Sequence, residues 1–256
     1  MKPGITASVL SHDRPILLGG VAAISLLSWL YLVRMAAGAA GMQSHAGHMH
    51  AAAPGFWLTF AMWTIMMVAM MLPAASPFVL CFAATHRQRK SESLPYVSTG
   101  IFLAGYFSVW TAFSAFTALL QQVLHRMALL SPAMTATSWT FAGGLLVAAG
   151  VYQWTPLKDS CLHHCRSPLG FLLGDWHDGP WGALRMGAEH GIFCVGCCWA
   201  LMLLPFAAGV MSILWMAALT VFILIEKVIP GGEIVGRVAG ALLVLCGGAL
   251  ILSALL

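Results

Sequence analysis

The region from 190 to 198 combines one histidine with three cysteines. They are His190, Cys194, Cys197 and Cys198. In a helix, which turns by about 100° per residue, the four side chains share an arc of about 100°. Gly187 and Gly191 lie on the same side, so another helix is expected to approach closely there. Thiolates and imidazoles bind copper and zinc, and a histidine inside a membrane is costly. The pattern predicts a soft-metal or redox site. The alternative is that the free cysteines serve as small apolar packing groups.

A second group of ligand-type residues lies about 30 positions earlier, in the run Cys161-Leu-His163-His164-Cys165. On the reducing side of a membrane, clustered cysteines are more often metal-binding or catalytic than disulfide-bonded. A zinc site with this spacing needs a second, distant pair of ligands, and the group at 190–198 can provide it. We therefore predict that the two groups act together.

Five methionines lie close together between residues 62 and 71. On one helix they cover half of its circumference over more than two turns; they are Met62, Met66, Met67, Met70 and Met71. Neutral thioethers hold a soft monovalent cation without burying an anion. Methionine is also a common, flexible packing residue, so ordinary packing is the alternative.

A short polar stretch precedes these five methionines and is rich in histidine and methionine. Its side chains are Met42, His45, His48, Met49 and His50. Imidazole and thioether together favour copper. We expect a loop that captures metal outside the membrane; a flexible or pH-sensitive polar loop is the alternative.

The composition requires an element that crosses a lipid bilayer. Of 256 residues, 60% are hydrophobic and 8% charged, against roughly 25% charged in soluble domains. This excludes a soluble globular enzyme, a disordered chain and a nucleic-acid binder. Long unbroken apolar runs predict helices rather than a barrel. The predicted fold is an all-α polytopic membrane bundle.

Seven transmembrane helices are expected. Their ranges are Ile16 to Met35, Phe56 to Phe82, Tyr96 to Leu120, Ser138 to Trp154, Met186 to Val210, Ser212 to Ile225 and Val235 to Leu256. The chain then divides into an N-terminal segment with the first helix (1–36), an outer loop (37–55) and a bundle (56–256) with an inner segment near 155–185. The second helix contains Pro73 and Pro77 and should kink or end early. The alternative for the first helix is a long cleavable signal.

The basic residues predict the orientation. With the N-terminus inside and the C-terminus outside, ten of the twelve fall on the inner side: Lys2, Arg14, Arg87, Arg89, Lys90, Lys158, Arg166, Arg185, Lys227 and Arg237. Arg34 and Arg126 fall outside. This asymmetry is typical of cytoplasmic loops. All eight acidic residues also fall inside.

Several other polar or sulfur side chains are interpreted as structural. Cys81 and Cys246 are expected to pack in apolar helices. Glu226 and Lys227 should form a pair of opposite charges at the inner interface. Arg185 and Glu189 are spaced for a helical ion pair, and Glu189 is a weak candidate for orienting the neighbouring His190.

Three stretches resemble a bacterial family of predicted metal-binding integral membrane proteins, catalogued as a domain of unknown function. They are Met70-Met71-Leu-Pro73, the run from Tyr152 to Gly170, and His190-Gly-Ile-Phe-Cys194-Val-Gly-Cys197-Cys198-Trp199. The resemblance covers roughly residues 56–230. It implies a bacterial inner-membrane location and a metal role for Cys161, His164, Cys165, His190, Cys194, Cys197 and Cys198.

The leading functional hypothesis is a permease that moves Cu(I) inward, from the outer loop along the methionines to the inner thiols. A non-transporting copper chaperone or assembly factor is the first alternative. A thiol oxidoreductase using Cys194 and Cys197, with Cys161 and Cys165 as a relay pair, is the second. A structural zinc ion is a further alternative. Enzymatic activity is not the favoured interpretation, and no P-loop is found. The expected partners are lipid, a metal ion and a cytoplasmic or periplasmic metal-handling protein.

Overall fold

The computed structural model describes residues 4–45, 55–89, 95–131, 134–174 and 176–255. Apart from one isolated bridge between Leu130 and Ala136, the regular structure in these ranges is helical, which confirms the all-α prediction. The helices are α1 (Gly4–His45), α2 (Phe56–Arg89), α3 (Pro95–Arg126), α4 (Trp139–Tyr152), α5 (Pro156–Arg166), α6 (Pro168–Gly174), α7 (Gly179–Cys198), the short η1 (Leu201–Leu203), α8 (Pro205–Ala208), α9 (Ile213–Val228) and α10 (Gly232–Leu255).

Four of these helices, α1, α2, α3 and α10, are long and apolar enough to cross a membrane. A fifth candidate is the bent pair formed by α7 and the segment Leu201–Ala208. The predicted fourth and sixth spans are helical, but α4 has 14 residues and α9 has 16. A straight crossing needs about 20 residues. Four to five spans therefore meet the length criterion among the described helices, rather than the expected seven.

The predicted fifth span is a broken helix. It begins at Gly179 instead of Met186, and α7 ends at Cys198, where the chain bends by 69°. Pro205 explains why the helix does not continue, because its ring would clash with the carbonyl of the residue four positions earlier. Gly209, with φ +103°, then turns the chain towards α9. The expectation of one continuous helix from 186 to 210 was wrong.

The second helix passes through both of its prolines and continues to Arg89. The alternative that it ends early was therefore wrong. Pro77 has no N–H group, so the carbonyl of Pro73 lacks its usual helical donor. The hydroxyl of Ser76 donates to that carbonyl at 2.7 Å, which compensates for the missing bond.

Helix α1 extends to His45. The first part of the predicted outer loop, residues 37–45, is therefore helical, and this helical part includes Met42 and His45. His48, Met49 and His50 lie outside the described residues. The indole N–H of Trp29 donates to the carbonyl of Ala69 at 3.2 Å, which ties α1 to α2. Most of the apolar window of α1 is not buried in the bundle, as expected for a lipid-facing helix.

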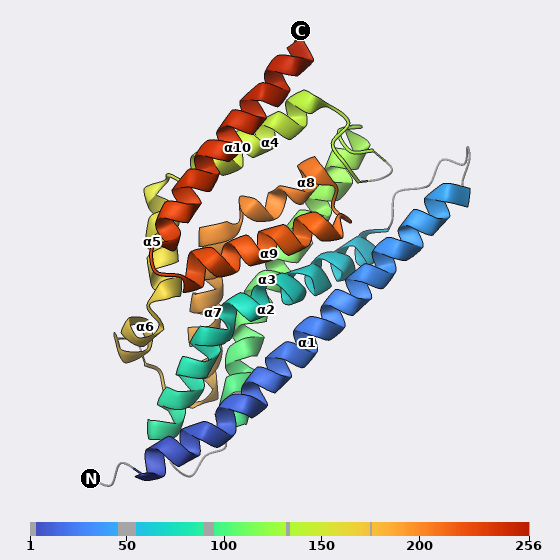
Figure 1. Ribbon diagram of the computed structural model, residues 1–256. Coiled ribbons are helices and arrows are strands. Elements are labelled where there is room, and N and C mark those ends of the chain that lie inside the picture. The colour runs from blue at the N-terminus through green and yellow to red at the C-terminus, as the bar shows by residue number, and fades with distance from the viewer. Residues whose placement is uncertain (1–3, 46–54, 90–94, 132–133, 175, 256) are drawn as a thin grey trace.

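Glycines allow two pairs of helices to approach closely. A Cβ atom at Gly105 or Gly187 would overlap backbone atoms of Leu184 or Phe102 respectively, so α3 and α7 pack backbone against backbone. The predicted close approach at Gly187 and Gly191 is thus confirmed. Helices α4 and α10 meet in the same manner, at Gly143 with Gly247, and lie together at the top of Figure 1.

Candidate metal centre

Helix α7 presents its four predicted ligands to the interior of the bundle. The exposed fractions are 4% for His190, 0% for Cys194, 1% for Cys197 and 0% for Cys198. This common burial confirms that they share one helical face. All seven cysteines are free thiols.

Helix α5 brings the second group of residues against this face. The sulfur atoms of Cys165 and Cys197 are 3.9 Å apart. Cys161 lies against Gly196, where a Cβ atom would stand 2.6 Å from the Cys161 sulfur. Glycine at 196 is therefore needed for α5 to lie this close. The pKa of Cys161 is raised mainly by burial and, to a lesser extent, by the nearby Cys197. The pKa of Cys165 is raised well above its ordinary value, mainly by contact with Cys194 and Cys197 and to a lesser extent by burial.

Cys194 is the centre of this group. Lys227 donates to its sulfur atom at 2.8 Å, and the Tyr106 hydroxyl lies 3.0 Å from the same atom. Three further thiols lie close enough to interact with it: Cys165, Cys197 and Cys198. We call Cys165, Cys194, Cys197 and Cys198 the thiol cluster.

Two of these thiols are turned towards the backbone. Cys197 and Cys198 donate to the carbonyl of Cys194 at 3.1 and 2.9 Å. Consistent with this, no three histidine, cysteine or acidic side chains in the described ranges form a ready metal-binding group. Joint coordination by two sulfurs of α7 therefore requires a rotation about a side-chain bond.

The ring of His190 lies in an aromatic enclosure one turn before Cys194. It stacks on Phe78 with centroids 3.8 Å apart, and Tyr106 and Phe102 lie at 5.4 and 6.2 Å. The predicted pair of Arg185 and Glu189 is present at 2.8 Å. The Glu189 carboxylate therefore bonds Arg185 of its own helix.

The two histidines of α5 lie differently from its cysteines. His163 is exposed. His164 stacks on Phe193 with centroids 4.2 Å apart, and its Nδ1 atom lies 2.8 Å from the carbonyl oxygen of Ser160. The structure therefore brings together the thiols of both groups, with the α5 histidines beside them.

The methionine face of α2 is buried inside the bundle. All five predicted side chains belong to the apolar core: Met62, Met66, Met67, Met70 and Met71. Phe78, which touches His190, shares a face with Met67 and Met71, since seven residues make about two helical turns. Helices α2 and α7 run in opposite directions (Figure 1). The ring contact between Phe78 and His190 therefore joins the methionine face of α2 to the ligand face of α7.

A buried ion pair links α5 to α9. Lys158 on α5 contacts Glu226 on α9, and the two side chains are 2% and 1% exposed. The Lys158 ammonium also donates to Gln153. The expectation that Glu226 pairs with its neighbour Lys227 at an interface is thus corrected. Glu226 bonds across to α5, and adjacent helical residues point in different directions.

The chain matches a known protein family over most of its length. The family model PpoB2, described as a copper chaperone, matches residues 60–250. The chain belongs to this copper chaperone family. The resemblance to a metal-related bacterial family is thereby confirmed. No curated protein and no solved structure matches the chain.

The family match includes the thiol cluster and the methionine face. The stretch from Met42 to His50 lies outside it. Membership supports a role in handling copper, and the apolar helices support membrane association.

Three residues around the thiol cluster were not singled out as part of a site by the sequence: Tyr106, Lys158 and Lys227. For Lys227 an indication existed. It lies four residues after Ile223 and eight after Leu219, on the buried face of an apolar helix, where a lysine is expensive without a partner. For Tyr106 the sequence holds no comparable indication, because buried aromatic residues are common in any core.

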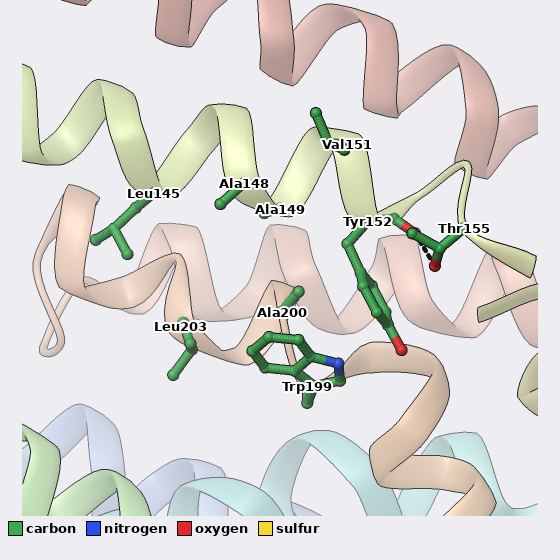
Figure 2. A pocket seen from close by; sticks show the side chains of 9 residues that line it. All are labelled: Leu145, Ala148, Ala149, Val151, Tyr152, Thr155, Trp199, Ala200 and Leu203. Carbon is green, nitrogen blue, oxygen red and sulfur yellow. Dashed lines mark hydrogen bonds between the residues drawn. The ribbon is translucent and has the colours of Figure 1, made fainter. Parts of the chain in front are cut away.

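An apolar pocket lies beside the cluster and is separate from it. Its volume is about 220 Å³, and its lining comes from α4, the start of α5 and the bend after α7: Leu145, Ala148, Ala149, Val151, Tyr152, Thr155, Trp199, Ala200 and Leu203 (Figure 2). The Tyr152 hydroxyl donates to the carbonyl of Gly196. The lining of the pocket contains no cysteine or methionine, so it lacks the ligands that a soft metal prefers.

Proposed function

We propose that this protein is a membrane-embedded copper chaperone that holds Cu(I) as cargo between Cys194 and Cys197. The observation that carries the proposal is the gathering of three further thiols, from two helices, around the buried Cys194: Cys165, Cys197 and Cys198. Thiolates are the preferred ligands of Cu(I). A buried thiol pair also protects the ion from water and from oxidation. Zinc is the alternative cargo.

Cys165 is the exchange ligand in this proposal. Its sulfur lies 3.9 Å from that of Cys197, while two metal–sulfur bonds of about 2.3 Å would span about 4.6 Å in a linear arrangement. A small rotation of either side chain makes up the difference. Cys165 is half-buried on α5. Transfer from Cys197 to Cys165 therefore moves the ion towards a more accessible helix and a protein partner.

The proposed topology has seven crossings, with the N-terminus in the cytoplasm and the C-terminus outside. The start of α1, the end of α2, the start of α3 and the start of α7 lie towards the lower left of Figure 1, and the end of α9 lies at its left near the middle. The end of α10 lies at the top. The short helices α4 and α9 and the broken α7 pair complete the crossings. The basic residues at the first side favour the cytoplasmic face of a bacterial inner membrane.

A permease is the second candidate, and the methionine face favours it. Met67 and Met71 lie in the buried core of the bundle, and thioethers pass a soft monovalent ion by ligand exchange without burying an anion. The outer residues Met42, His45, His48, Met49 and His50 would then collect the ion. Copper flux into liposomes containing the purified protein alone supports the permease. Retention without flux, followed by release to an added thiol acceptor, supports the chaperone.

The central experiment is a Cu(I) titration of the purified full chain under anaerobic, reducing conditions. Cys194→Ser with Cys197→Ser should lose the tightly bound ion. The matched control is Cys81→Ser with Cys246→Ser, which also removes two thiols but leaves the cluster intact. Equal Cu(I) binding by both double variants would refute the proposed site. Elemental analysis of the wild type as purified then distinguishes copper from zinc.

A further inference from the structure

The buried charges around the thiol cluster do not cancel among themselves. Lys158 and Glu226 neutralise each other in an ion pair. Arg166, at the rim, lies 3.7 Å from Glu233 and donates to the carbonyl of Ile229. Lys227 takes part in none of the salt bridges found within the described ranges, and its ammonium is directed at the Cys194 sulfur. One positive charge is therefore left for the thiols to balance.

This surplus charge acts in an environment where screening is weak. Lys227 is 8% exposed, and Cys194, Tyr106 and Cys197 are at most 1% exposed. Charges interact more strongly in such a site than in water, and an uncompensated buried charge is strongly unfavourable. The net charge of the occupied site therefore decides which ions it accepts.

The geometry points to Lys227 as the residue that makes this site select a monovalent over a divalent cation. This inference rests on the proposed function of Cys194 and Cys197. Two thiolates and one ammonium sum to a single negative charge. A monovalent soft cation brings that sum to zero, whereas Zn²⁺ leaves one positive charge buried without a partner.

Sulfur ligands alone do not achieve this selection. Thiolates also form stable sites with zinc, so the ligand set leaves both ions acceptable. Without Lys227, two thiolates would carry two negative charges, and the divalent ion would be the one that gives neutrality. The ammonium of Lys227 on α9 thus changes the electrostatic preference of the same two thiolates from the divalent to the monovalent ion.

The test is a competition between Cu(I) and Zn²⁺ for the purified full chain, in wild type, Lys227→Gln and Lys227→Arg. Lys227→Gln removes the charge and keeps an N–H donor for Cys194. It should shift the ratio of Cu(I) to Zn²⁺ affinity towards zinc by about 100-fold. Lys227→Arg keeps the charge and should preserve the ratio within about threefold.

The outcomes separate this inference from the proposed function. A wild type that binds no Cu(I) refutes the proposed function itself. A wild type that binds Cu(I), with the same affinity ratio in Lys227→Gln, refutes only the role of Lys227. If Lys227→Gln does not fold, Lys227→Met supplies a neutral side chain of similar length suited to an apolar site, and the same shift is expected. An equal shift in Lys227→Arg would also overturn the inference, because charge would not be its cause.

Discussion

The thiol cluster and the methionine face both present sulfur to the interior of the bundle, but their surroundings differ. Cys194 has an ammonium at 2.8 Å and a phenol hydroxyl at 3.0 Å. Met67 and Met71 lie in the apolar core. A thiolate is an anion and needs a counter-charge when it is buried, whereas a thioether is neutral and needs none.

In the proposed function, this difference separates the residues that hold an ion from those that pass it on. A charged ligand pair with a fixed counter-charge forms a deep binding site. A row of neutral ligands binds weakly at each position, which is what rapid ligand exchange requires. Four experiments would test this division between the two regions.

The framework of the thiol cluster should depend on its buried ion pair. Glu226→Ala leaves Lys158 buried without its partner, which should lower the free energy of unfolding by about 3–5 kcal/mol. Thermal and denaturant unfolding in detergent would measure the change. The matched control is Glu189→Ala, which removes a more exposed pair and should change stability by less than about 1 kcal/mol. Similar losses in both variants would show that the buried pair has no special role.

The equilibrium affinity for Cu(I) should depend on the thiol cluster and not on the methionines. Cys197→Ser should weaken Cu(I) binding by about 100-fold, because it replaces a thiolate with a hydroxyl of low affinity for a soft ion. Met67→Leu with Met71→Leu should leave the affinity within about threefold, since leucine fills a similar volume. Competition with a chromophoric Cu(I) chelator would measure both. A comparable loss in the methionine variant would remove the distinction between the two regions.

Loading rates should show the opposite pattern. In stopped-flow measurements, Met67→Leu with Met71→Leu should slow the arrival of Cu(I) at the cluster by about tenfold, because a thioether relay is interrupted. Met127→Leu is the control, since this methionine is 64% exposed and lies outside the face. An unchanged rate would assign the methionines of α2 to packing alone.

Exchange through Cys165 should become slower as the pH falls. The pKa of Cys165 is raised by its contacts with Cys194 and Cys197 and by burial, so its thiol is protonated at neutral pH. Accepting Cu(I) requires loss of that proton. Transfer to an external thiol acceptor should therefore accelerate with rising pH, by at most about tenfold per unit, and Cys165→Ser should flatten this dependence. A pH profile that is the same in both proteins would exclude Cys165 as the exchange ligand.

The sequence was sufficient where one helix decides the geometry. The face shared by His190 and the three cysteines follows from helical periodicity alone, and so does the close approach at Gly187 and Gly191. Pro205 also indicated a break, because an interior proline kinks or breaks a helix. It was missed because hydropathy continued across it.

Contacts between distant segments were beyond reach. Lys158 and Glu226 are 68 residues apart, and Lys227 reaches Cys194 across 33 residues. Neither pairing has a periodic pattern that would reveal it. Adjacent opposite charges at 226 and 227 favoured a local pair, and only the packing of α5, α7 and α9 shows that each residue faces a different helix.

If Cu(I) is held as proposed, the interlocked backbones of α3 and α7 restrict how it leaves the protein. Gly105 and Gly187 leave no room for sliding between these two helices, so together they form a rigid wall that holds Tyr106 and Cys194 in fixed register. Release must therefore come from displacement of the smaller pieces on the other side. The 11-residue α5, anchored to α9 by Lys158, is the part whose tilting would open a way out.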